Sequence, residues 1–97
     1  MHVAAVRVEL RLRNVHSLKE KRHIVKSVIA HLTKTFGVAV SEVDHQDKWQ
    51  RCDLGIAAVA PQAGQLDRIL HSVRRSLDQI TDVEVLGAEV AYLEDPA

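Results

Sequence analysis

VRVELRLRNVHSLKEKRHIVKSVIAHLTKTFG, residues 6–37, is the stretch that decides the fold of this chain. Apolar and charged residues alternate from His2 to Arg13, and a period of two predicts a strand with one buried face. Ser17 and Glu20 then have the Ser-x-x-Glu spacing of a capping box, which indicates the start of a helix. Gly37 indicates its end, since glycine adopts the left-handed C-cap conformation at little cost.

The helix predicted over residues 18–36 should pack against a core through an apolar stripe at helical spacing. The stripe consists of Leu18, Val25, Val28, Ile29, Leu32 and Phe36. Most basic residues of this helix fall largely off the stripe, so we expect them to face water. They are Lys19, Arg22, Lys26 and Lys34.

The rest of the chain continues the pattern of strands and helices. The further predicted elements are strands over residues 38–44, 49–60 and 83–93 and a helix over residues 65–80. Pro61 and Gly64 separate the third strand from that helix, since both residue types interrupt regular structure. In the second strand, Glu42 and Val43 both fit the same face, which predicts a bulge there.

The element order βαββαβ predicts an α+β, ferredoxin-like fold over residues 1–97 as a single domain, with a four-stranded antiparallel sheet in the order 4-1-3-2 and both helices on one face. The other face is open, and alternation puts charged residues of the two central strands on it. These are Arg7, Glu9, Arg11, Arg51 and Asp53. Opposite charges on neighbouring strands can pair, so a solvated charge lattice is the simpler interpretation of this face. Trp49 favours an interface instead.

Composition indicates a globular domain with an aliphatic core. The apolar fraction is 46%, and Phe36, Trp49 and Tyr92 are the three aromatic residues. The one cysteine, Cys52, has no partner for an intrachain disulfide, which suits a reducing cytoplasm. We expect a cytoplasmic protein, since the apolar N-terminal run is too short for a signal sequence and no run is long enough to cross a membrane.

The net charge of zero hides an asymmetry. Residues 1–36 carry eight Lys/Arg against two Asp/Glu, and residues 37–97 carry five against eleven. This division predicts one basic and one acidic region if the fold keeps the halves apart, and mutual neutralisation if the fold interleaves them.

Four blocks of residues carry a resemblance to a known family. They are Ser17-Leu18-Lys19-Glu20-Lys21-Arg22, Val25-Lys26-Ser27, Phe36-Gly37-Val38-Ala39-Val40-Ser41-Glu42-Val43 and Trp49-Gln50-Arg51. In these blocks the chain resembles the YlxP-like family of small bacterial proteins (domain of unknown function 503). The resemblance implies a ferredoxin-like fold but no established activity, cofactor or catalytic residue. Genes of the family often lie near those for translation factors and a ribosome-binding factor, which implies a role around ribosomes or RNA.

The strongest candidate site is the basic start of the first helix. Free backbone N–H groups there favour an anion, and basic side chains oppose the helix dipole, so a phosphate would meet both. The candidate phosphate contacts are Lys19, Lys21, Arg22 and Lys26, extended by Arg11 and Arg13. The alternative is that Glu20 and acidic residues of the second half offset this charge, with the stem of Lys21 lying along the edge of the core.

Signals for metal binding and catalysis are weak. Asp44, His45 and Asp47 gather in one connection, but no second His or Cys has zinc-like spacing, so we predict no metal site. Glu42 and Asp44 should share a strand face, which is common and unspecific. Cys52 alternates onto the core face and should be an inert buried thiol. No nucleophile, phosphate-loop or dinucleotide motif is present in the sequence, and we expect neither an enzyme nor a cofactor.

Two classes of function follow. The leading hypothesis is a non-catalytic binding module for structured RNA or a ribosomal particle, acting through the basic first helix. The competing hypothesis is a protein-interaction module, for example a homodimer through the open sheet face or an edge strand. Trp49 and Arg51 would then form the interface. No membrane partner is expected.

Overall fold

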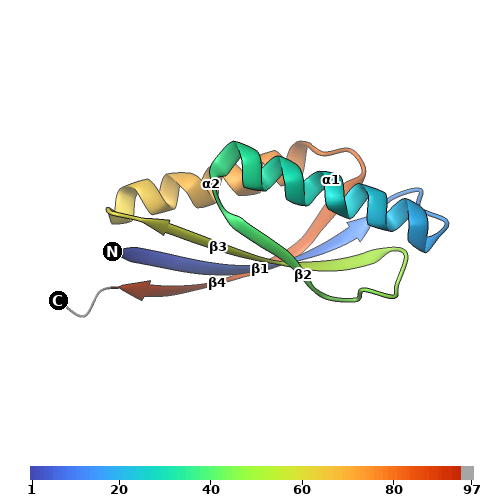
Figure 1. Cartoon of the computed structure of the whole chain (residues 1–97), viewed down its shortest axis with the longest axis horizontal. Coiled ribbons are helices and arrows are strands. Elements are labelled where there is room, and N and C mark those ends of the chain that lie inside the picture. Colours follow the sequence, from blue (N-terminus) through green and yellow to red (C-terminus); the bar gives the residue numbers. More distant parts are fainter. Residues whose placement is uncertain (95–97) are drawn as a thin grey trace.

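Two helices cover one face of a four-stranded antiparallel sheet in the computed structural model, which describes residues 1–94 (Figure 1). The elements are β1 (His2–Leu12), α1 (Leu18–Phe36), β2 (Ala39–Asp44), β3 (Arg51–Ala60), α2 (Ala63–Gln79) and β4 (Val83–Glu94). The strand order is β2-β3-β1-β4, which is the predicted order counted from the other edge. The predicted α+β, ferredoxin-like fold is therefore confirmed. No helix within residues 1–94 combines the length and apolarity that a membrane span requires.

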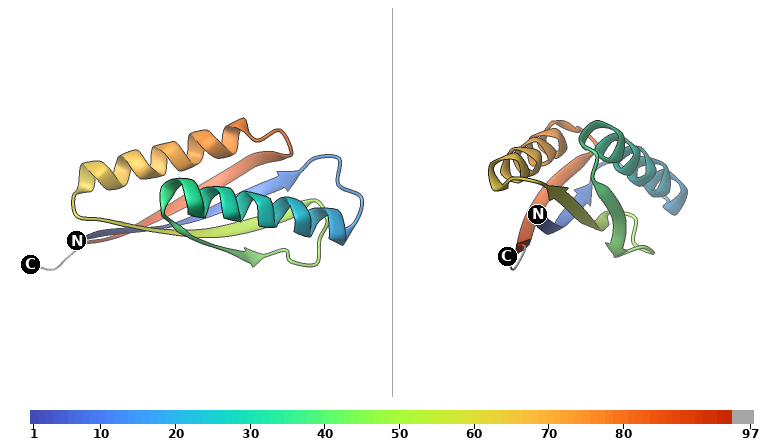
Figure 2. Two further views of the ribbon diagram at one scale, coloured as in Figure 1. Left: turned by 45° about the horizontal axis from the view of Figure 1, so that its top comes forward. Right: turned by 60° about the vertical axis from the view of Figure 1, so that its left-hand side comes forward.

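The core lies between the sheet and the two helices, which Figure 2 shows side by side on one face. Even-numbered residues of the central strands point into it, as alternation predicts: Val8 and Leu10 on β1 are 2% exposed, and Cys52 and Leu54 on β3 are fully buried. Leu32 of α1 belongs to the same core cluster and is also fully buried. The core is aliphatic, as composition indicates.

Both ends of α1 form as predicted. Ser17 accepts a hydrogen bond from the Glu20 backbone N–H at 3.1 Å, and the Glu20 carboxylate accepts one from the His16 backbone N–H at 2.9 Å. The first bond satisfies an amide of the first helical turn, and the second ties the Glu20 side chain to the residue before the cap. At the other end Gly37 has φ 66°, the left-handed conformation, and its N–H donates to the Thr33 carbonyl.

Two predicted boundaries shift by two residues. The second helix begins at Ala63 rather than at residue 65, so Gly64 lies in its first turn instead of in the connection. The first turn tolerates a glycine because its N–H groups have no intrahelical partner there, and Pro61 alone ends the strand. The third strand begins at Arg51, which leaves Trp49 in the connection before it.

The predicted bulge in β2 is confirmed, because the register against β3 shifts between Glu42 and Asp44. The extra residue reverses the alternation. Glu42 lies opposite Leu54 and faces the helices, whereas Asp44 lies opposite Asp53 on the open face. The expectation that Glu42 and Asp44 share a face is therefore wrong. Val43 packs over the open face so closely that a Cβ on Gly55 would lie 2.9 Å from its Cγ1.

Candidate functional site

The eight basic residues of the first third of the chain divide into two sets. Four of them pair with carboxylates of the second part of the chain: Arg7, Arg11, Arg13 and Lys21. The other four project from α1, are exposed, and have no ion pair within residues 1–94: Lys19, Arg22, Lys26 and Lys34. The charge asymmetry is therefore offset at the four paired residues and kept at the four exposed positions of α1.

Lys21, one of the predicted phosphate contacts at the start of α1, is not accessible at the surface. It is fully buried, its Nζ lies 2.9 Å from Glu42 Oε2, and it also donates to the His45 backbone carbonyl. The ammonium is thus enclosed between α1 and the start of the β2–β3 connection and cannot contact a phosphate in solvent. The expectation that Lys21 contacts nucleic acid is wrong for that reason. A signal was present in the sequence, since Lys21 stands four residues before Val25 on the same helical stripe.

Arg11 and Arg13 stay exposed, but both are engaged in ion pairs. Both guanidinium groups pair with one carboxylate, that of Glu84 on β4, at 3.0 Å and 3.3 Å. Arg13 also donates to the Thr81 carbonyl at 3.4 Å. These two arginines contact the start of β4 and the turn before it, so they extend the basic patch less than the sequence suggests.

Lys19, Arg22 and Lys26 form the compact part of the basic surface, which we call the α1 cation face. Their spacing of three and four residues puts them on one side of the helix, across about 10 Å along its axis. The nearby acid in the same turns, Glu20, has its carboxylate engaged in the helix cap. The α1 cation face is therefore a positive surface with no ion pair of its own among the described residues.

The charged end of the open sheet face is a lattice of ion pairs, as the simpler interpretation predicts. Arg7 bridges Asp53 at 2.9 Å and Asp44 at 3.2 Å, and Arg51 pairs with Glu9. The hydrogen bond from Arg7 to Asp53 raises the pKa of that guanidinium. The backbone N–H of residue 45, 2.7 Å from Asp44 Oδ1, lowers the pKa of Asp44.

The two residues predicted for an interface also lie at this charged end. Arg51 is already engaged by Glu9, whereas Trp49 is 49% exposed and stands in the β2–β3 connection. The structure does not bring them into one apolar surface, and their interface role stays a prediction.

Asp44, His45 and Asp53 come together as a possible ligand set, with one donor atom from each within 4.8 Å of the others. Asp47, which the sequence grouped with the first two, is not in this set. The cationic guanidinium of Arg7 already binds one oxygen of each aspartate. The acceptors left are Asp53 Oδ1 and His45 Nε2, which are 3.8 Å apart. A metal ion would meet the positive charge of Arg7, so this geometry supports an arginine-centred ion cluster.

A serine–histidine contact joins the two helices and was not visible in the sequence, because its members are 45 residues apart. His31 Nε2 lies 2.8 Å from Ser76 Oγ, and Thr35 Oγ1 lies 3.4 Å from His31 Nδ1. Acyl transfer would also need free N–H donors beside the serine. Ser76 stands inside α2, where the neighbouring amides serve the helix. The contact therefore joins α1 to α2 and does not make a nucleophile.

Cys52 is fully buried, as expected, and burial raises the pKa of its thiol to about 12. Glu42, which also pairs with Lys21, raises that pKa further. A thiol in such surroundings is a poor nucleophile at neutral pH.

Sequence comparison connects this arrangement to a family. A family model described as "Protein of unknown function (DUF503)" matches residues 3–90. The chain belongs to this DUF503 family. The DUF503 protein "Uncharacterized protein YlxP" of Bacillus subtilis (strain 168) is similar to it, with 38% identity over 68 residues, which are 70% of this chain and 74% of that protein. The predicted resemblance is confirmed, and neither description assigns an activity.

Among solved structures, the fold of this DUF503 chain is similar to that of "De novo designed protein Foldit4". The TM-score is 0.55 at 13% identity, over 98% of this chain and 99% of the designed one. At that identity the likeness shows the fold alone.

Proposed function

We propose that this DUF503 protein is a non-catalytic module that binds a structured polyanion, namely RNA as it occurs in a ribosomal particle, through the α1 cation face. One observation carries the proposal. The fold pairs Arg7, Arg11, Arg13 and Lys21 with carboxylates but leaves the four exposed cations of α1 without an ion pair among the described residues. These four are Lys19, Arg22, Lys26 and Lys34.

The chemistry of these side chains suits phosphate contacts. Lys19, Arg22 and Lys26 are hydrogen-bond donors with a fixed positive charge, and phosphate oxygens are the acceptors that such groups bind in nucleic acids. Base stacking has little support, because single-strand binding modules stack bases on aromatic side chains of the central strands. Here the exposed aromatic side chains are Trp49, in the connection before β3, and Tyr92, on the edge strand β4. Recognition would then depend on backbone shape and charge. Three phosphate contacts predict a salt slope of about −2 to −3 in log K against log salt.

The test compares two charge-reversal variants with the same change in net charge. Lys19→Glu/Arg22→Glu alters the α1 cation face, and Arg68→Glu/Arg75→Glu alters two exposed arginines of α2. Lys21 is left intact because its change would disturb the core. Binding to purified ribosomal particles and to a structured ribosomal RNA fragment is measured by sedimentation and fluorescence anisotropy. We expect the α1 variant to bind at least about tenfold more weakly, and the α2 variant to stay within about threefold of the parent protein.

Equal losses in the two variants would contradict the proposal, because they would show dependence on net charge alone. Binding that both variants retain, with no dependence on salt, would also contradict it. Circular dichroism of all three proteins controls for folding.

A further inference from the structure

The open sheet face carries a row of small residues near the N-terminus of β1, at the end of the sheet that is distant from the α1 cation face. The strand register aligns Ala5 with both Ala57 and Ala91, and Ala57 with Ala39. One alanine from each of the four strands thus stands in a single row across the sheet, and all four are exposed.

The next row, toward the N-terminus of β1, is made of larger apolar side chains. Val3 aligns with Val59 and with Leu93. Val59 and Leu93 are 61% and 66% exposed, more than any other large hydrophobic residue that the structure describes. Residues that share a strand face are two positions apart, so the two rows are about 6.6 Å apart. The apolar end of the face is therefore a ridge beside a trough.

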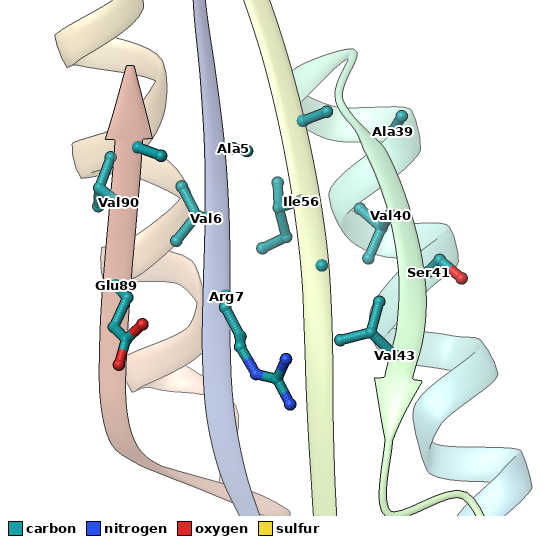
Figure 3. A pocket seen from close by; sticks show the side chains of 13 residues that line it. Ala5, Val6, Arg7, Ala39, Val40, Ser41, Val43, Ile56, Glu89 and Val90 are labelled. Carbon is teal, nitrogen blue, oxygen red and sulfur yellow. The ribbon is translucent and has the colours of Figure 1, made fainter. Parts of the chain in front are cut away.

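The trough is bounded on its other side by Arg7, Glu89 and Val43, and the resulting hollow has a volume of about 670 Å³. Figure 3 shows the hollow with the helices behind the sheet, which places it on the open face. The alanine row of its lining suits a partner that presents a row of apolar side chains with matching spacing.

We propose that this molecule is a second copy of the same chain. A two-fold axis parallel to the two rows, and midway between them, places the ridge of each copy over the alanine trough of the other. Val3 of one copy then faces Ala5 of the second, and the two β1 strands cross in opposite directions. Large side chains meet small ones in both halves, which is the self-complementarity that an isologous interface requires.

Charge supports an identical partner. The ridge and the trough contain no charged residue, and the next row has one positive and one negative side chain, Arg7 and Glu89. The contact between ridge and trough therefore brings no like-charged side chains together. The ion pairs at the charged end of the face lie outside this contact, so they remain hydrated in the dimer.

The size of the surface indicates which class of interface it can form. Four strands about 4.8 Å apart, over about 20 Å of strand length, give roughly 400 Å² per copy in projection. This is about half of what each partner buries in a standard stable complex. We therefore expect a dimer that forms with rising protein concentration rather than an obligate one.

The test is the mass of the full chain by sedimentation equilibrium from micromolar to millimolar concentration. The parent protein should approach twice its monomer mass, and Val59→Glu should raise the dissociation constant at least about a hundredfold, because its carboxylate would lose water in the apolar contact. Leu93→Lys, on another strand, repeats the test if the first variant folds poorly. Trp49→Ala, at the charged end of the same face, should dimerise like the parent protein.

A second readout reports the geometry. A mixture of Val3→Cys and Ala5→Cys proteins should form an intersubunit disulfide faster than either protein alone, and buried Cys52 should not compete. A parent protein that stays monomeric overturns the proposal, whatever other molecule the trough then binds. So does a dimer that survives both charged variants or that depends on Trp49. None of these results bears on RNA binding by α1, so the two proposals can fail separately.

Discussion

At the scale of single residues, Lys21 of α1 forms a buried ion pair with Glu42 of β2. Its ammonium is the partner of Glu42 and of the His45 carbonyl, so its removal would leave a largely buried carboxylate without a cation. We expect Lys21→Met to lower the free energy of unfolding by about 3 kcal/mol, since breaking a buried pair strands the other charge. The double variant Lys21→Met/Glu42→Leu should recover most of this loss, because both charges are gone.

Urea denaturation of the two variants measures the effect. Lys19→Met, on the exposed side of the same helix, is the matched control and should change stability by less than about 0.5 kcal/mol. A double variant as unstable as Lys21→Met alone would show that the ion pair is not the cause.

The buried thiol of Cys52 makes a second prediction at this scale. Because burial raises its pKa to about 12, very little thiolate exists at mildly alkaline pH in the folded protein. We expect iodoacetamide to leave Cys52 unmodified in native protein and to alkylate it rapidly in urea, since the thiolate is the nucleophile. Mass spectrometry of both reactions over time is the measurement. Native alkylation at the denatured rate would place the thiol at the surface.

At the scale of elements, the start of α1 depends on the cap in which Ser17 Oγ accepts from the Glu20 N–H, while the Glu20 carboxylate accepts from the His16 N–H. Ser17→Ala should lower the free energy of unfolding by about 1 kcal/mol, because an orphan N–H loses its acceptor, and Ser17→Asp should largely restore it. Ser72→Ala, an exposed serine inside α2, is the control for the same chemical change. It should be neutral or slightly stabilising, since alanine is the better helix former. Thermal and chemical unfolding of the three variants decide the matter, and equal effects of the two alanine changes would speak against the cap.

The β2 bulge shows what an element-scale pattern can predict. The conflict between Glu42 and Val43 is local, so it could be read from the sequence. Its consequence is not local. By turning Glu42 toward the helices it supplies the buried acid that Lys21 needs, and by turning Asp44 outward it gives Arg7 a second partner.

At the scale of the whole molecule, some cations are paired and others are not. We therefore predict that salt affects the free energy of unfolding and the binding of a polyanion differently. Most ion pairs of the open face join partly exposed side chains, and such pairs contribute little to stability. The Arg7–Asp53 pair has a buried carboxylate, and salt screens such a pair much less. Raising the salt concentration to about 1 M should therefore change the free energy of unfolding by less than about 1 kcal/mol. Binding through the α1 cation face should be lost over the same range. Parallel denaturation and binding titrations at each salt concentration test this, and a strong salt effect on stability would assign the lattice a larger role.

By itself, the sequence determined the order of the elements, both ends of α1, the bulge in β2 and the aliphatic core. These depend on periodicity and on neighbours within a few residues. Only the tertiary structure decided which cations stay unpaired, because Arg11, Arg13 and Lys21 meet carboxylates that long-range strand pairing brings to them. The alanine row also needed the structure, since each member comes from a different strand and only the register aligns them. Local spacing fixes what a residue can do, and the register of distant segments fixes which partner it meets.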